Sequence, residues 1–173
     1  YSSILHSERS GLHERILSVL EKQENKDPSL LAHHYQAVGS VSALDYYSEA
    51  AEAAWENKWY AQCMQMVEQA EAFRLQHKIK VAKSTTTRWE YLVAMSLYRA
   101  GDLSGGTTRA RKCLASLGCS CGSGSKISIF RLKAAQSFRC LIPCLATRCQ
   151  QEEQICNLRG IMIDYFYHNQ DHK

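Results

Sequence analysis

The 173-residue sequence has few of the residues that interrupt helices, with only two prolines and nine glycines. Proline cannot donate a backbone hydrogen bond and glycine weakens a helix interior, so their scarcity favours long uninterrupted helices. No stretch alternates apolar and polar side chains over a useful length, which excludes an extensive β-sheet. We therefore expect an all-α protein.

Long apolar runs are also lacking, and the longest stretches, such as Ile161–Ile163, are far shorter than the roughly 18 residues that a membrane-spanning helix needs. The first residues, YSSILHSERSG, lack the basic and apolar segments of a signal peptide, and they lack an initiator Met. We expect a cytoplasmic piece of a longer protein with no membrane partner.

The charge of the chain is not concentrated in one place. The net charge is +4, and the Lys and Arg residues are interspersed with Asp and Glu. Proteins that bind nucleic acids usually gather their basic residues on one face. This distribution therefore predicts no nucleic-acid partner.

Eight cysteines are many for this length, but no spacing among them matches a familiar zinc or iron–sulfur site. Without a secretory signal, the thiols are expected to be reduced, and several lie in apolar or helical surroundings that favour burial. We expect no metal and no cofactor, with a thiol- or zinc-binding helical protein as the alternative. The two groups of cysteines on which that alternative rests are Cys113, Cys119 and Cys121, and Cys140, Cys144 and Cys149.

No catalytic motif is present. The glycine-rich stretch GCSCGSGSK differs from a phosphate-binding loop because Lys126 follows a serine and the stretch follows a helix instead of a strand. The histidines have no local signature of nucleophilic catalysis beside them. His33 and His34 point about 100° apart on a helix, so they cannot jointly face one ion. We predict no catalysis by these residues.

Apolar residues recur at intervals of three and four along most of the chain, as Leu12, Ile16, Val19 and Leu20 do. Gly39 and Gly101 are placed to end helices. The polar stretch Ser84–Arg88 predicts either a boundary between two helices or the start of the second one within it. Helices are expected over about 7–20, 29–38, 41–55, 60–76, 89–100, 104–117, 127–141 and 150–167.

Pairs of these helices recur with similar residues. Small side chains follow each turn at helical spacing, and the turn contains a glycine in the first and last copies but Trp59-Tyr60 in the middle one. The small residues are Ala43, Ala50, Ala70, Gly106, Ala110 and Cys113. This pattern resembles the tetratricopeptide repeat, a helix–turn–helix unit of about 34 residues. It implies a right-handed superhelical stack of helical hairpins, with a generic helical bundle as the alternative.

Two segments resemble a narrower family. The first contains Tyr1, Leu5, Arg9, Leu12, His13, Ile16, Leu20 and Glu21, and the second contains Leu31, Ala32, His34, Tyr35, Gly39, Ala43, Tyr47, Ala50, Ala51 and Ala54. Together they resemble the region downstream of the ATPase core in large signalling ATPases associated with class III adenylyl cyclases, including soluble-adenylyl-cyclase-like proteins. The resemblance covers residues 1–118 and implies that the parent is an adenylate cyclase or signalling ATPase whose nucleotide-binding machinery lies upstream.

The expected organisation has four parts. Residues 1–26 form a helix that links to an upstream domain, 27–118 form the repeats, and 119–126 form a flexible linker. Residues 127–173 form a helical pair that either continues the stack or folds back as a cap.

Together these features predict a non-catalytic interaction or regulatory module whose partner is a protein or an adjacent domain of the same chain. In such repeats the first helix of each hairpin lines the concave face. The candidate partner-binding residues are therefore Tyr35, Gln36, Glu90, Ser96 and Arg99.

Overall fold

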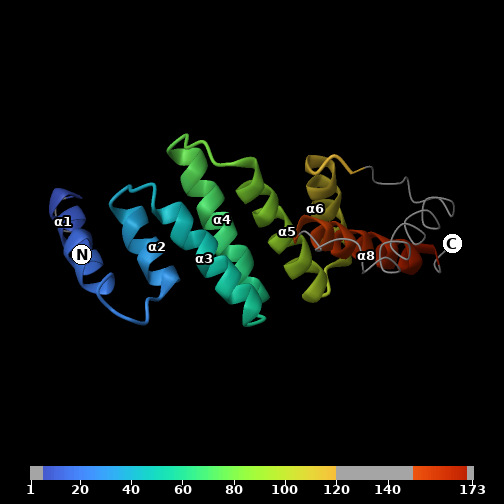
Figure 1. Cartoon of the computed structure of the whole chain (residues 1–173), viewed down its shortest axis with the longest axis horizontal. Coiled ribbons are helices and arrows are strands. Elements are labelled where there is room, and N and C mark those ends of the chain that lie inside the picture. Colours follow the sequence, from blue (N-terminus) through green and yellow to red (C-terminus); the bar gives the residue numbers. More distant parts are fainter. Residues whose placement is uncertain (1–5, 120–149, 171–173) are drawn as a thin grey trace. The chain divides into compact units, whose positions relative to one another are not determined.

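The computed structural model describes residues 6–119 and 150–170, and every regular element within them is an α-helix (Figure 1). The all-α prediction is therefore confirmed for this part of the chain, and the helix expected over 127–141 lies outside it. None of the described helices is both long enough and apolar enough to cross a membrane. The helices are α1 (His6–Leu20), α2 (Pro28–Ala37), α3 (Ala43–Glu56), α4 (Tyr60–Gln76), α5 (Lys83–Arg99), α6 (Leu103–Ser116) and α8 (Gln150–Gln170).

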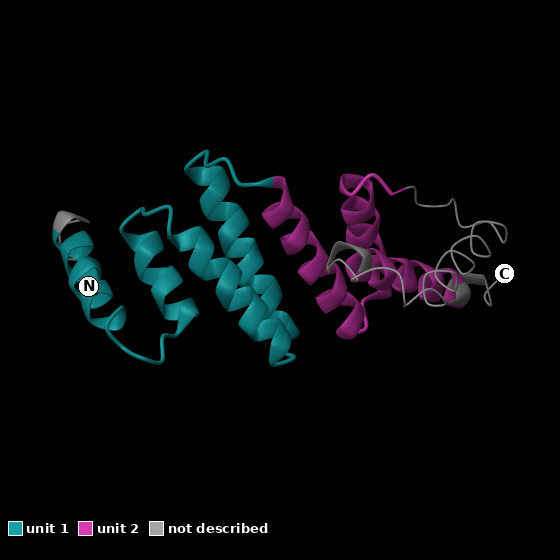
Figure 2. Cartoon of the chain, in the orientation of Figure 1, with its two compact units in different colours: residues 1–82 teal, residues 83–173 magenta. Residues whose placement is uncertain are grey.

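The chain divides into two compact units, Tyr1–Ala82 and Lys83–Lys173 (Figure 2). Unit 1 contains α1 to α4, and unit 2 contains α5, α6 and α8. The division falls within the region 27–118 that the sequence assigned to a single array of repeats. The helix expected to link to an upstream domain, α1, belongs to unit 1 and packs on α2.

In unit 1 each helix packs on its neighbour in the sequence, and α1 to α4 lie side by side in chain order (Figure 1). The core of this unit consists largely of small side chains on α3 that meet larger ones on the neighbouring helices. Small residues let helix axes approach closely, so that dispersion contacts form along the whole length of a pair. The buried residues are Leu31, Ala32, Ala43, Leu44, Tyr47, Ala50, Ala51, Ala54, Cys63, Met66, Val67, Ala70 and Phe73.

The ends of the helices of unit 1 follow local chemistry. Asp27 caps α2 by accepting hydrogen bonds from the backbone N–H groups of Ser29 and Leu30, and Pro28 occupies the first turn. Gly39 ends the turn after α2 with φ of +71°, as predicted. The turn between α3 and α4 has no glycine, and there Lys58 adopts φ of +62°.

The packed face of α1 differs from the expected one. The apolar spacing places Leu12, Ile16, Val19 and Leu20 along α1. The first three side chains are 42%, 41% and 60% exposed, and Leu20 is half-buried. The buried residues of this helix are His13 and Leu17, which lie on a different side. The prediction is wrong for α1 because a buried histidine does not contribute to an apolar pattern.

In unit 2, α5 packs on α6, and both helices contact α8. Helix α5 begins at Lys83, one residue before the stretch Ser84–Arg88, so this stretch forms the first turns of a helix and is not a boundary between two. Gly106 on α6 lies so close to α5 that an added Cβ would be 3.2 Å from the Ala94 carbonyl oxygen and from the Tyr98 backbone nitrogen. The small residue at this position thus permits the close approach that its place in the sequence suggested.

Helix α8 confirms the helix expected from residue 150 onwards. It buries an apolar stripe and makes two polar contacts with α5; the stripe consists of Ile155, Leu158, Ile161, Met162, Ile163 and Phe166. The Tyr98 hydroxyl donates a hydrogen bond to Asp164, and the Asn157 amide donates one to the Tyr91 hydroxyl at 2.9 Å.

Candidate functional site

Three histidines meet where α1 packs on α2. His13 comes from α1, and His33 and His34 come from adjacent positions of α2. The Nδ1 atoms of His13 and His34 are 2.7 Å apart, and both side chains are buried. At this distance one hydrogen atom lies between the two nitrogens. One imidazole donates its Nδ1–H, and the unprotonated Nδ1 of the other accepts it.

The surroundings of this pair disfavour a positive charge. Burial is the main cause that lowers the pKa of His13, and the nearby His33 adds to it. Burial likewise lowers the pKa of His34, with contributions from His13 and then His33. The pair is therefore a neutral hydrogen-bonded contact at pH 7.

The cluster does not have the geometry of a metal site. No group of three or more His, Cys, Asp or Glu residues in the described ranges, 6–119 and 150–170, is arranged to hold an ion. Two nitrogen ligands of one tetrahedral zinc ion lie about 3.3 Å apart, because each zinc–nitrogen bond is about 2.0 Å long. The His13 and His34 nitrogens face each other at hydrogen-bonding distance instead.

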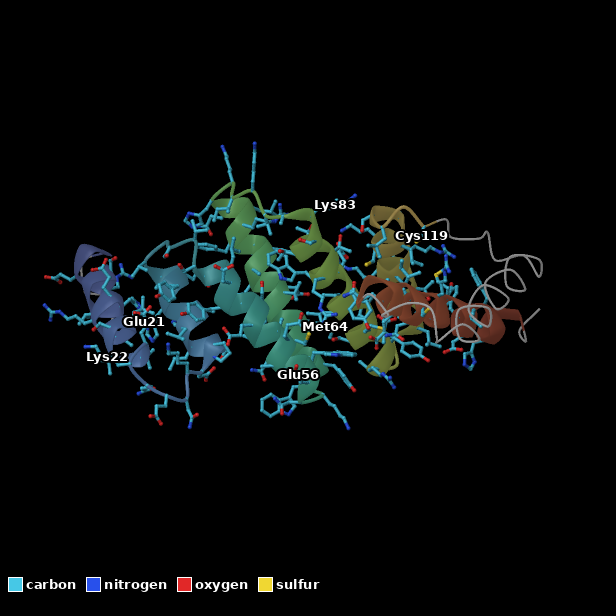
Figure 3. The ribbon with its side chains drawn as sticks, viewed as in Figure 1. Glu21, Lys22, Glu56, Met64, Lys83 and Cys119 are labelled. Atoms are coloured by element: carbon cyan, nitrogen blue, oxygen red, sulfur yellow. The ribbon has the colours of Figure 1, made fainter. Side chains whose placement is uncertain are left out.

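Tyr35, a candidate partner-binding residue, lies on the same helix and is already engaged. Its hydroxyl donates a hydrogen bond to the carboxylate of Glu21, just beyond the end of α1 (Figure 3), and its ring stacks on Tyr46 at 5.1 Å. The hydrogen bond to Glu21 is the main cause that raises the pKa of Tyr35 to about 12. Tyr35 thus joins α1, α2 and α3 within unit 1.

Gln36, the second candidate, lines a pocket between α2 and the end of α4. The pocket has a volume of about 330 Å³ and is lined by His33, Gln36, Ala37, Phe73, Gln76 and His77. The Tyr47 hydroxyl donates a hydrogen bond to the side-chain oxygen of Gln36, and this bond fixes the orientation of the amide. Of the five candidates, Gln36 is the one that lines this pocket.

The remaining three candidates belong to α5 in unit 2, and their surroundings differ. Glu90 forms salt bridges with Arg109 at 3.1 Å and with Lys112, which tie α5 to α6. Ser96 is completely buried, so it is not accessible to a partner in this structure. Arg99 is exposed at the end of the helix.

The described cysteines are free thiols. Burial was expected for Cys63, Cys113 and Cys156, and the first two are buried whereas Cys156 on α8 is only partly buried. Burial is the main cause that raises the pKa of Cys113 to about 12, so this thiol is a poor nucleophile and a poor metal ligand. Cys119, just after α6, is partly exposed (Figure 3). Cys121, Cys140, Cys144 and Cys149 lie outside the described residues.

Comparisons with protein families, curated proteins and solved structures found no significant match to the chain. The geometry of the two units therefore carries the functional argument.

Sequence reasoning did not foresee the contact between His13 and His34. The two residues are 21 positions apart and belong to different helices, so no periodicity links them. One signal in the sequence pointed to these residues: His13 and Glu21 belong to the first segment of the family resemblance, and His34 and Tyr35 belong to the second. His13 contacts His34, and Glu21 contacts Tyr35.

Proposed function

We propose that the chain is a non-catalytic scaffold of tetratricopeptide-like helical hairpins that binds a segment of another protein or an adjacent domain of its own chain. The observation that carries this proposal is in unit 1, where α2, α3 and α4 pack in sequence order and leave a pocket between α2 and α4. Helix α2 is the first helix of its hairpin, and in a hairpin repeat the first helices line the concave face.

The residue types at the helix contacts support a repeat more than an irregular bundle. Alanines at positions 43, 50, 51 and 54 are buried on one side of α3, and Ala70 and Cys63 are buried on α4. Gly106, Ala110 and Cys113 occupy similar places on α6 in unit 2. A regular array of small residues permits hairpins to stack at a constant angle, which an irregular bundle does not require.

Selection of binding peptides tests the interaction proposal directly. A library of 12-residue peptides displayed on phage would be selected on the purified 173-residue chain and counter-selected on the heat-denatured chain. We expect a family of related peptides that bind the folded chain with dissociation constants of roughly 1–100 μM, the range of transient recognition. Failure to enrich any sequence would contradict a peptide-binding scaffold.

The repeat geometry has a test of its own. A crystal structure should show successive hairpins related by a constant right-handed rotation. A closed bundle without that relation would refute the tetratricopeptide-like arrangement and leave only the all-α architecture.

The parentage implied by the family resemblance is a second proposal. We propose that the chain is part of a signalling ATPase or adenylate-cyclase-like protein of the cytoplasm, in which it regulates or positions the catalytic domains. The resemblance of the two segments supports this proposal, and in unit 1 these segments contact each other through His13 with His34 and Glu21 with Tyr35. The coding sequence upstream of Tyr1 should then encode a G-x4-G-K-[ST] loop after a strand, and its absence would refute the proposal.

A further inference from the structure

The pocket of unit 1 is small for a ligand site. Its volume of about 330 Å³ is at the lower limit of small-molecule sites, which run from roughly 300 to 1,000 Å³. The buried ring of Phe73 forms an apolar wall, and the His77 ring packs on it with the centroids 4.3 Å apart. A flexible side chain with a polar end suits such a space.

The polar groups of the lining include several hydrogen-bond donors. His33 and His77 each present an imidazole that donates one N–H even when neutral, and Gln36 and Gln76 each carry an amide N–H₂ group. Because the Gln36 oxygen already accepts from Tyr47, the groups that Gln36 can offer to a ligand are its amide N–H groups. This lining favours an occupant that accepts hydrogen bonds.

The charged residues of the segments that flank the pocket also favour an anionic occupant. None of the six lining residues is acidic, and residues 28–44 and 72–82, which form α2 with its turn and the end of α4 with its loop, contain no Asp or Glu. Arg74, Lys78 and Lys80 lie in the second segment, and both lysines are exposed. Cations in a segment that flanks a pocket attract an anionic partner and repel a basic one.

We propose that this pocket receives a Glu or Asp side chain of an acidic peptide. The carboxylate accepts hydrogen bonds from His77, His33 and the Gln36 amide, and Lys80 attracts the neighbouring acidic residues. This proposal rests on the peptide-binding function proposed above and specifies the chemical class of the partner.

The test is a binding titration with two matched probes. The first is a fluorescein-labelled 12-residue peptide in which glutamate alternates with alanine, and the second has glutamine in place of each glutamate. Fluorescence anisotropy at 150 mM salt and pH 7.5 should show the glutamate peptide binding the full chain about tenfold more tightly or better, because charge-assisted hydrogen bonds are the stronger kind.

Variants separate the pocket from general attraction to a basic surface. His77→Ala removes a donor from the pocket, and Lys80→Gln removes a charge beside it. Lys26→Gln is the matched control, since this exposed lysine precedes α2 and lies at the end remote from the pocket. We expect His77→Ala and Lys80→Gln each to weaken binding of the glutamate peptide by about fivefold, with Lys26→Gln within twofold of the wild type.

Three results would overturn the proposal. They are equal affinity for the two peptides, no binding of the glutamate peptide at 1 mM, and equal weakening by Lys26→Gln and Lys80→Gln with His77→Ala unchanged. Circular dichroism and the melting temperature of each variant establish that it is folded.

The two proposals fail in different ways. Phage-selected peptides that bind regardless of His77→Ala would refute the acidic pocket and leave the scaffold function intact. If the selection yields no peptide and the glutamate probe does not bind, both proposals fall.

Discussion

The contact between α1 and α2 and the contact between α3 and α4 lie in the same unit but rest on different chemistry. Helix α3 packs on α4, and the two helices bury alanines and apolar residues, among them Ala51, Ala70 and Phe73. Helix α1 meets α2 through the His13–His34 pair and, just beyond its end, through the Glu21–Tyr35 hydrogen bond, while three of its apolar side chains remain exposed.

Because of this difference, the stability of the α1–α2 contact depends on pH and that of the α3–α4 contact does not. Apolar burial contributes roughly 25 cal/mol for each Å² removed from water and does not depend on pH. A hydrogen bond between two neutral imidazoles contributes about 1 kcal/mol and requires that at least one of them stays unprotonated. Unit 1 thus combines a pH-insensitive hairpin with a helix whose attachment depends on titratable groups.

The largest expected effect comes from removing the buried aromatic ring of α4. Phe73→Ala should lower the free energy of unfolding by about 3–5 kcal/mol, because it removes apolar contacts and leaves a cavity. Leu75→Ala on the same helix is the control, since that side chain is 66% exposed. Urea denaturation followed by circular dichroism measures both, and similar losses would contradict the assigned core.

A smaller effect should follow from enlarging a residue on the same helix. Ala70 is fully buried, whereas Ala72, two positions away on α4, is exposed. Ala70→Leu should therefore lower the free energy of unfolding by about 1–3 kcal/mol through overpacking, while Ala72→Leu should leave it nearly unchanged. If Ala70→Leu is tolerated as well as Ala72→Leu, then α3 and α4 do not pack as closely as described.

The attachment of α1 should weaken in acid. The folded-state pKa values of His13 and His34 lie below the ordinary value of 6.5, so the folded state resists protonation. Their contribution to stability is complete above about pH 6.5 and is lost as the pH falls below it, towards the folded-state values. Thermal denaturation at pH 7.5, 6.5 and 5.5 should show a melting temperature that falls as the pH falls.

A paired replacement isolates the histidines as the cause of that decrease. The double variant His13→Leu/His34→Leu removes both partners and should have a nearly unchanged stability at pH 7.5, with a smaller loss between pH 7.5 and 5.5. The single variant His13→Leu leaves the buried His34 without its partner and should cost about 1–3 kcal/mol. An equal pH dependence in the wild type and the double variant would assign it to other groups.

The smallest effect is expected in the turn between α3 and α4, where Lys58 has φ of +62°. Lys58→Gly should raise the free energy of unfolding by about 0.5–1 kcal/mol. Lysine pays a steric cost in the left-handed region that glycine does not, and this cost exceeds the entropy that glycine loses on folding. Lys26→Gly, in the loop before α2, is a control at which no such gain is expected. Loss of stability in Lys58→Gly would show that the turn is not under strain.

Much of the helical architecture could be predicted from the sequence, because apolar residues at intervals of three and four identify helices that pack through apolar faces. The alanine face of α3 and the side of α4 that contains Cys63 and Val67 are buried as this pattern indicated. The left-handed glycines at 39 and 101 also followed from their position after a helix.

The pattern failed where packing is polar or depends on distant residues. Ser84–Arg88 suggested a boundary because Ser and Thr are weak helix formers, but Thr87 is buried in α5, so tertiary contacts outweigh the local propensity. The contact of α1 relies on His13 instead of the apolar stripe, and no rule of spacing shows which histidine of α2 it meets. The pocket beside Gln36 depends on the end of α4, about 40 residues further along the chain.

The most direct test of the contrast within unit 1 is hydrogen exchange measured by mass spectrometry at pH 7.5 and pH 5.5, after correction for the intrinsic exchange rates. The account predicts that the amides of α1 lose protection at pH 5.5 while those of α3 and α4 keep it, because only the α1 contact depends on neutral histidines. Loss of protection in all three helices together, or unchanged protection of α1, would contradict it.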